Sequence, residues 1–164
     1  MKGFTVFGAA APRGDIATLL RGLQEFARAR GGDAQLLDAA VVFGREHLDI
    51  AFEHAVRARE RGTSVAAHLA VEFLRYAAGE RRIDRAIERI GAKPGRPVVV
   101  ALFGPVPVAA AAKASGLRRD DRVMTWRGKS LRRIGITAAE ERALPAGTAR
   151  DLVLERVALA DLAR

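Results

Sequence analysis

The sequence predicts an α/β (α+β) fold, in which a small central sheet of about four strands, mixed or antiparallel, packs with helices. Segments with strand and helix periodicity alternate along the 164 residues, a pattern typical of layered structures. Hydrophobic residues make up 49% of the chain, which suits an ordinary core and argues against intrinsic disorder. No internal repeat or low-complexity linker divides the chain, so we expect residues 1–164 to form a single domain.

Four segments have the composition of strands. Residues 2–8 form a short alternating segment, and residues 34–43 form a largely apolar run that suits a central strand. Residues 97–104 are rich in β-branched side chains and are bounded by proline and glycine, so they give the clearest strand. A weaker strand pattern covers residues 122–126.

Helical periodicity predicts the segments between and after these strands. Asp15 is placed to cap a helix that stops at Gly31, and a second helix covers residues 44–60. An alanine-rich helix is expected over residues 108–115. A final helix over residues 148–163 has a wider apolar surface than a surface helix needs. Either it is deeply buried, or part of it faces another protein.

Residues 65–91 predict two helices that meet at a basic turn, residues 76–82, which we call the elbow. Apolar side chains recur at three- and four-residue steps on both sides of it. Thr63 and Ser64 stand where the first helix needs an N-cap, and Gly91 is a typical C-terminal stop. The stripes therefore predict core contacts, and the turn between them presents charge.

The charge of the chain points to a polyanionic partner. The formal net charge is +9, the pI is near 11.2, and most of the cations are arginines, whose planar fork suits phosphate. The alternative is an arginine-rich proteome. The chain has no cysteine, which excludes disulfides and thiolate chemistry. No apolar run approaches the ~20 residues that span a bilayer, so we expect no membrane partner and a cytoplasmic location.

No catalytic constellation is visible, and neither a metal nor another cofactor is predicted. The segment 128–130 ends like a phosphate-binding loop, but Val123 occupies the position where that motif needs glycine. His47, His54 and His68 have no carboxylate at metal-ligand spacing, so we interpret them as ordinary core or surface histidines.

Two basic features remain as candidates for nucleic-acid binding. In the elbow, Tyr76 lies among arginines, an arrangement in which a ring stacks on a base while cations hold phosphates. The alternative is a solvated turn whose tyrosine packs onto the core. The second feature is the basic run over residues 117–133, where Trp126 accompanies seven cations. It is either a phosphate-binding face or an exposed surface with its tryptophan inward.

The elbow resembles a known family. The segment EFLRYAAGERRI over residues 72–83, with the Ile-Gly-Ala-Lys ending at residues 90–93, is similar to the signature of the small kinase-binding subunit of the KEOPS complex, the PRPK-binding protein family. Gly79, Arg81 and Ile83 match the family's usual sequence motif, whereas other positions in the turn differ from it. Similarity extends over most of the chain except the basic run.

The resemblance implies a non-catalytic accessory subunit of the assembly that makes threonylcarbamoyladenosine on tRNA. Such a subunit would dock on a Bud-type atypical kinase/ATPase and help to capture tRNA, including its 3′ CCA end. The expected RNA contacts are Tyr76, Gly79, Arg81, Arg82, Arg85 and Lys93. The expected partner contacts are Ile87, Ile90, Leu152 and Leu159.

Two other functions stay open from the sequence. The chain could be a small enzyme that acts on a phosphorylated or nucleotide substrate at the turns near Gly8, Gly44 or Gly104, where α/β folds place ligands. Alternatively, it could be a stand-alone RNA-binding protein of translation. A kinase partner would distinguish a KEOPS subunit from a stand-alone RNA-binding protein.

Overall fold

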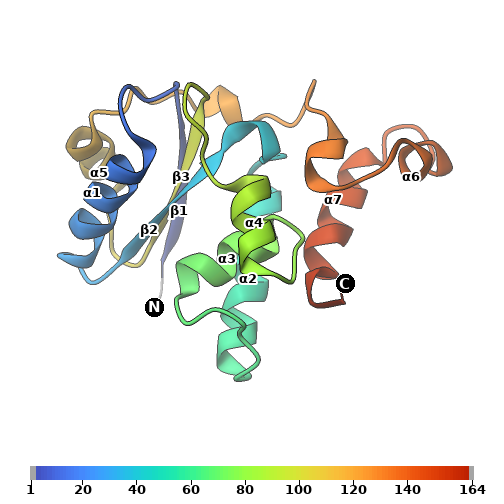
Figure 1. Ribbon diagram of the computed structural model, residues 1–164, viewed down its shortest axis with the longest axis horizontal. Helices are drawn as coiled ribbons and strands as arrows, with labels where there is room; N and C mark the ends of the chain where they lie inside the picture. The colour runs from blue at the N-terminus through green and yellow to red at the C-terminus, as the bar shows by residue number, and fades with distance from the viewer. Residues whose placement is uncertain (1–2, 163–164) are drawn as a thin grey trace. The chain divides into compact units, whose positions relative to one another are not determined.

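A computed structural model describes residues 3–162 and contains a three-stranded antiparallel sheet. The strands are β1 (Phe4–Ala9), β2 (Asp33–Asp38) and β3 (Val98–Phe103), in the order β1-β3-β2 (Figure 1). The α+β prediction is confirmed, with one strand fewer than expected. The predicted first strand began at Lys2, which lies outside the described residues.

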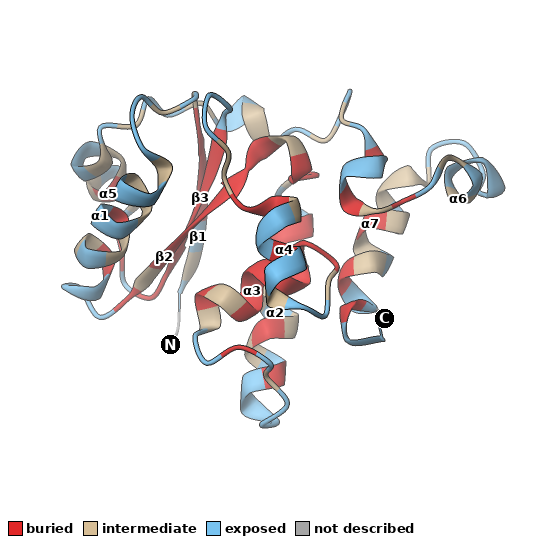
Figure 2. Ribbon diagram, viewed as in Figure 1, coloured by how far each residue is buried: buried red, intermediate tan, exposed pale blue. Residues whose placement is uncertain are grey.

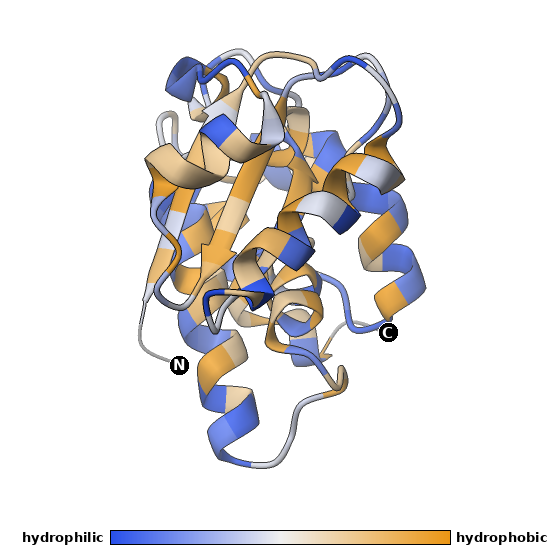
Figure 3. Ribbon diagram, turned by 90° about the vertical axis from the view of Figure 1, so that its left-hand side faces the viewer, coloured by the Kyte–Doolittle hydropathy of each residue, from blue (hydrophilic) through white to orange (hydrophobic). Residues whose placement is uncertain are grey.

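The central position of β3 explains its uninterrupted apolar sequence. All six of its residues are buried (Figure 2), so neither face of the strand requires polar side chains. Val100 lies opposite Phe7 of β1 and Leu36 of β2 in the two registers. The strands are accordingly among the most hydrophobic segments of the ribbon in Figure 3. The prediction over residues 97–104 is thereby confirmed within a residue at each end.

The chain forms two compact units, and the sheet belongs to the first of them, Met1–Ala39 with Gly91–Thr125, which we call the sheet unit. Its helices α1 (Ile16–Arg28) and α5 (Val108–Ser115) lie side by side. Leu23 of α1 and Ala111 of α5 share the buried cluster with Leu36 and Val100. Asp15 caps α1 as predicted, because its carboxylate accepts a hydrogen bond of 2.8 Å from the Thr18 amide.

The predicted strand over residues 122–126 is wrong. The chain instead forms the 3₁₀ helix η2 (Asp121–Met124) beside the edge of β1. Asp120 donates its amide to the Gly8 carbonyl at 2.8 Å, and the Asp121 carboxylate accepts the Gly8 amide at 2.9 Å. A Cβ on Gly8 would come within 2.5 Å of the Asp120 oxygen, so the glycine permits this close approach. A side-chain oxygen therefore binds the amide that a fourth strand would pair.

The second compact unit, Ala40–Ile90 with Trp126–Arg164, is helical, and we call it the helical unit. It contains α2 (Arg45–Glu60), α3 (Leu69–Ala77), α4 (Ile83–Ile90) and α7 (Ala149–Ala158), with the shorter α6 (Ala138–Ala143). Two 3₁₀ helices, η3 (Leu131–Ile134) and η4 (Ala160–Leu162), complete it. Helix α2 packs against both α3 and α7.

Two predicted element ends are corrected. The strand predicted over residues 34–43 stops at Asp38, and η1 (Ala39–Val41) follows. The Phe43 amide donates to Nδ1 of His47 at 3.1 Å and is therefore unavailable to a β-ladder. The final helix predicted over residues 148–163 is interrupted after Ala158, and its predicted end at Ala163 lies outside the described residues.

The predicted N-cap of the first elbow helix is also wrong. Helix α3 begins at Leu69, with His68 at the N-cap position instead of Thr63 or Ser64. The Thr63 amide donates to the Ala58 carbonyl at 2.9 Å and belongs to the end of α2. The segment before α3 is fixed instead by Glu72 of that helix, whose carboxylate accepts the Ala66 amide.

His47 joins the start of α2 to the end of α3 from inside the helical unit. Its side chain is fully buried, with Nε2 2.8 Å from the Ala77 carbonyl oxygen and Nδ1 accepting the Phe43 amide. These partners require a neutral ring that carries its proton on Nε2. Burial lowers the pKa of His47 to about 4, which keeps the ring neutral at physiological pH.

Candidate functional site

The elbow is built on a left-handed glycine at the end of α3. Gly79 has a φ of +64°, its amide donates to the Tyr76 carbonyl at 2.9 Å, and the Glu80 amide donates to the Arg75 carbonyl at 3.1 Å. This is the Schellman pattern, in which the chain reverses and unpaired carbonyls are satisfied. A Cβ on Gly79 would lie 3.2 Å from Cβ of Arg156 in α7. Both backbone conformation and space therefore favour glycine here.

A buried ion network lies behind this turn. The guanidinium of Arg75 has no exposed surface, and Nη2 lies 2.7 Å from both Glu72 Oε1 and Asp161 Oδ1. The other oxygen of Glu72 accepts the Ala66 amide at 2.8 Å, which holds the segment before α3. Burial alone would lower the pKa of Arg75, but its hydrogen bonds to both carboxylates outweigh this and raise it. The network joins three separate segments of the helical unit.

Tyr76 is part of this network rather than of the surface. Its side chain is 2% exposed, and its hydroxyl donates to Asp161 Oδ2 at 2.6 Å. Burial and the Asp161 carboxylate raise the pKa of Tyr76 to about 12. Its ring lies beside the His54 ring, and the Arg75 guanidinium stands 4.3 Å from its centroid. A ring enclosed in this way offers no free face to a base, so we assign Tyr76 to the core. This agrees with the alternative prediction, in which the tyrosine of the turn packs onto the core.

Glu80, which differs from the residue usual in the family motif, forms an ion pair within the fold. Its carboxylate lies 2.7 Å from Nη2 of Arg89, and Nη1 of Arg89 donates to the Ala78 carbonyl at 3.1 Å. Arg89 thus connects α4 back to the end of α3, and its guanidinium passes 3.1 Å from where a Cβ on Gly135 would stand. The glutamate therefore contributes to closing the elbow.

Three predicted cations remain on the outside of the elbow. Arg81, Arg82 and Arg85 are all exposed. Arg82 forms an exposed ion pair with Asp84 at 2.7 Å, whereas Arg81 and Arg85 have no carboxylate partner within residues 3–162. Lys93 belongs to the sheet unit, where its ammonium donates to the Gly91 carbonyl at 3.0 Å. The elbow therefore combines a buried ion network, which fixes the turn, with an exposed group of arginines.

A groove beside Gly79 holds two of the predicted partner contacts. It has a volume of about 290 Å³, and its lining includes Leu152, Leu159 and Leu162. Leu159 is 44% exposed and Leu162 is 74% exposed. Charged side chains border the leucines, among them Arg156, which is ion-paired with Glu140. An exposed apolar floor with a charged rim is typical of a protein-docking surface.

The other two predicted partner contacts have different environments. Ile87 on α4 is 52% exposed. Ile90 is fully buried, so the prediction that it contacts a partner is wrong. Its spacing in the stripe of α4 places it toward the core, as for Ala86, and the sequence pattern alone did not separate the two isoleucines.

Sequence reasoning missed the residues that position the elbow. Glu72 and Arg75 are three residues apart, which is a visible helix-face pair, but nothing in the sequence shows that both are buried. Asp161 lies 86 residues from Arg75, and no local signal connects them. In the basic run, Lys129 is also structural, because its ammonium donates to the Val42 carbonyl at 2.5 Å.

A metal site requires several grouped ligands, and a membrane-spanning helix requires length and an apolar composition. Within residues 3–162, no three His, Asp or Glu side chains are grouped to hold a metal ion. Over the same residues, no helix has both the length and the apolar composition to cross a membrane. Helix η2 packs closely against Gly8 itself, near the end of β1.

The family model described as kinase binding protein CGI-121 matches residues 16–121 of this chain, which is more than half of the 164 residues. The chain belongs to this family. The CGI-121 match confirms the resemblance to the small KEOPS accessory subunit. It covers both elbow helices and ends before α6 and α7. No curated protein gives a significant match to the sequence.

Proposed function

We propose that this chain is the non-catalytic, kinase-binding subunit of a KEOPS assembly that forms threonylcarbamoyladenosine on tRNA. In this role it docks on a Bud-type atypical kinase/ATPase and helps to recruit tRNA through the 3′ CCA end. The observation that carries the proposal is membership in the CGI-121 family of kinase-binding proteins. The elbow and the leucine groove are the two surfaces to which we assign these tasks.

We assign kinase docking to the groove of α7 and η4. Leu159 and Leu162 are exposed, and burying such side chains stabilises a complex by roughly 25 cal/mol per Å² of apolar surface. Leu152 forms part of the same lining, so the three leucines offer a continuous patch. The exposed Ile87 of α4 is the alternative contact, and it lies within the family match.

We assign tRNA contact to Arg81, Arg82 and Arg85. Their guanidinium groups are exposed on a turn whose backbone is fixed by the Arg75 network and the Glu80–Arg89 pair. A turn whose backbone is already fixed loses less conformational entropy when it binds phosphates than a mobile loop does. Stacking by Tyr76 is not part of this proposal, because the ring is buried.

The test for the RNA surface is the affinity for tRNA with and without its CCA end, measured by fluorescence anisotropy over a series of salt concentrations. The variant Arg81→Ala with Arg85→Ala should lower affinity for intact tRNA by about tenfold and reduce the log–log salt slope by about 1.4, since each single-strand phosphate contact contributes about 0.7. Loss of the CCA end should produce little further change in this variant.

The matched control is Arg45→Ala with Arg57→Ala. These two arginines are exposed on α2 of the same unit, and each is ion-paired with a carboxylate four residues away. The control removes the same formal charge and should leave the affinity nearly unchanged. Equal losses in both double variants would mean that net charge, rather than the elbow, holds the tRNA. A kinase complex that never forms would instead favour a stand-alone RNA-binding protein.

A further inference from the structure

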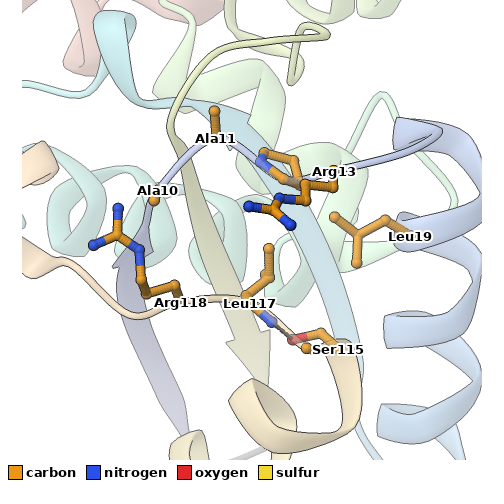
Figure 4. A pocket seen from close by; sticks show the side chains of 9 residues that line it. Ala10, Ala11, Arg13, Leu19, Ser115, Leu117 and Arg118 are labelled. Carbon is orange, nitrogen blue, oxygen red and sulfur yellow. Dashed lines mark hydrogen bonds between the residues drawn. The ribbon is translucent and has the colours of Figure 1, made fainter.

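The sheet unit contains a pocket that the proposed function does not use. It has a volume of about 400 Å³, within the range of small-molecule sites, and lies between the loop after β1 and the segment after α5. Its lining includes apolar side chains, Leu19 and Leu117 among them, together with Arg13 and Arg118 (Figure 4). Two arginines therefore border a hollow that has both polar and apolar walls.

Arg118 differs from its neighbours in the basic run. Arg119 is paired with Asp121 at 2.7 Å, and Arg122 is paired with Asp120 at 2.8 Å. Arg118 has no carboxylate partner within residues 3–162, although its charge helps to lower the pKa of Asp120, after the larger effect of the Arg122 hydrogen bond. The two arginines that flank the pocket segment are therefore ion-paired, whereas Arg118, which lines the pocket, is not paired within the described part of the chain.

Arg13, on the loop after β1, also lacks an ion-pair partner among the described residues. No carboxylate of residues 3–162 forms a salt bridge with Arg13. The nearest acid in sequence, Asp15, is committed to α1, because it accepts hydrogen bonds from the amide and the hydroxyl of Thr18 at 2.8 and 2.7 Å. Two guanidinium groups that form no ion pair with the described residues are suited to a phosphate, which each can bind through two parallel hydrogen bonds.

We propose that this pocket binds a nucleotide, with its phosphate held by Arg13 and Arg118 and its base or sugar over Leu19 and Leu117. The ligand is either a free mononucleotide or one nucleotide within an RNA chain, since the chemistry recognised is the same. The backbone that carries Arg118 is held in place, because the Ala10 amide donates to the Arg118 carbonyl at 2.9 Å. The site is separate from the elbow and does not rest on the role proposed for it.

The experiment titrates the full chain with adenosine monophosphate, with adenosine, and with tRNA trimmed of its CCA end. Binding is followed by amide chemical shifts for the small ligands and by anisotropy for the RNA. Trimming removes the contribution that we assign to the elbow, so this arm reports on the pocket separately. The variant Arg13→Ala with Arg118→Ala should lower the affinity for the bound ligand by about tenfold or more. The single variant Arg13→Glu should act in the same direction.

The control is Arg119→Ala with Arg122→Ala, which removes the same charge from the adjacent paired arginines. Binding of adenosine monophosphate but not adenosine, with a loss only in the pocket variants, supports a free nucleotide. A loss confined to trimmed tRNA, with a salt slope reduced by about 0.7 for the one phosphate in the pocket, supports an RNA nucleotide. The proposal is overturned if pocket and control variants weaken binding equally, or if neither ligand responds to the pocket variants.

Discussion

The guanidinium of Arg75 and the carboxylate of Asp161 lie 2.7 Å apart, although 86 residues separate them in the chain. This contact fastens η4 to the end of α3. The same carboxylate accepts the Tyr76 hydroxyl, and burial, which would raise the pKa of Asp161, is outweighed by the hydrogen bonds from Tyr76 and Arg75 that lower it. Since Leu159 and Leu162 flank Asp161, the ion pair also positions the groove that we assign to the kinase.

Removing the charge of Arg75 should destabilise the helical unit severely. In Arg75→Met, Glu72 keeps a fully buried carboxylate without its cation, a situation that typically costs about 3–5 kcal/mol. The free energy of unfolding from urea titration measures this. Arg82→Met is the control, because Arg82 belongs to an exposed ion pair and should change stability little. Similar losses in the two variants would contradict a buried network.

Acid should destabilise the protein between pH 6.5 and about 4 through His47. Its pKa in the fold is about 4, against 6.5 for an ordinary histidine, so the unfolded chain binds the proton more tightly. The stabilisation by the neutral ring is complete above pH 6.5 and is lost as the pH falls, by about 3 kcal/mol in total. Carboxylates with lowered pKa values, such as Asp161, act at lower pH.

The measurement is the urea midpoint as a function of pH. Burial also lowers the pKa of His54, so His54→Gln is the variant that separates the two histidines. Most of the pH dependence should persist in His54→Gln. A midpoint that stays constant from pH 6.5 to 4 in the unmodified chain would show that His47 is not held neutral.

Tyr76 should titrate far above an ordinary tyrosine. It is the one tyrosine in the sequence, so phenolate absorbance reports on it alone. Burial and Asp161 raise its pKa to about 12 in the fold, whereas the chain unfolded in urea should titrate near the ordinary value of about 10. Stability should therefore fall as the pH rises through this interval. Titration near 10 in the folded protein would mean an exposed ring and would restore Tyr76 as a candidate for base stacking.

Two glycines at helix ends allow the energetic effect of the close approach between Gly79 and α7 to be measured. Gly79 and Gly62 have φ values of +64° and +69°, but a Cβ on Gly62 would meet nothing within 4 Å, whereas one on Gly79 would meet Arg156 at 3.2 Å. Gly62→Ala should cost about 1 kcal/mol for the left-handed conformation, and Gly79→Ala about 1–3 kcal/mol more for overpacking. Equal costs in urea titrations would show that α7 does not pack against the turn.

Elements with local signals were predictable from the sequence. The run around β3, the Asp15 cap and the stripes of α3 and α4 each have a pattern within a few residues, and each element exists. Helix α6 had such a signal too, since Thr137 and Glu140 form a capping box at the expected spacing.

The errors arose where side chains satisfy backbone groups across long separations. The expected fourth strand failed because Asp121 binds the Gly8 amide, 113 residues away. Tyr76 was a stacking candidate because its arginine neighbours are visible in the sequence, whereas its partner Asp161 is 85 residues away. Ile87 and Ile90 share one stripe, and only the packing of α4 separates the exposed from the buried residue.

The central claim, that this chain is a kinase-binding subunit, is tested most directly by the dissociation constant for the Bud-type atypical kinase, measured by isothermal titration calorimetry. We expect a stable one-to-one complex that weakens at least about tenfold in Leu159→Asp with Leu162→Asp, because burying an unpaired carboxylate at an apolar interface is costly. Val65→Asp, at a residue 51% exposed before α3, is the control and should bind normally. Loss of binding in Ile87→Asp alone would move the contact to α4. The absence of any complex at micromolar concentrations would contradict the account.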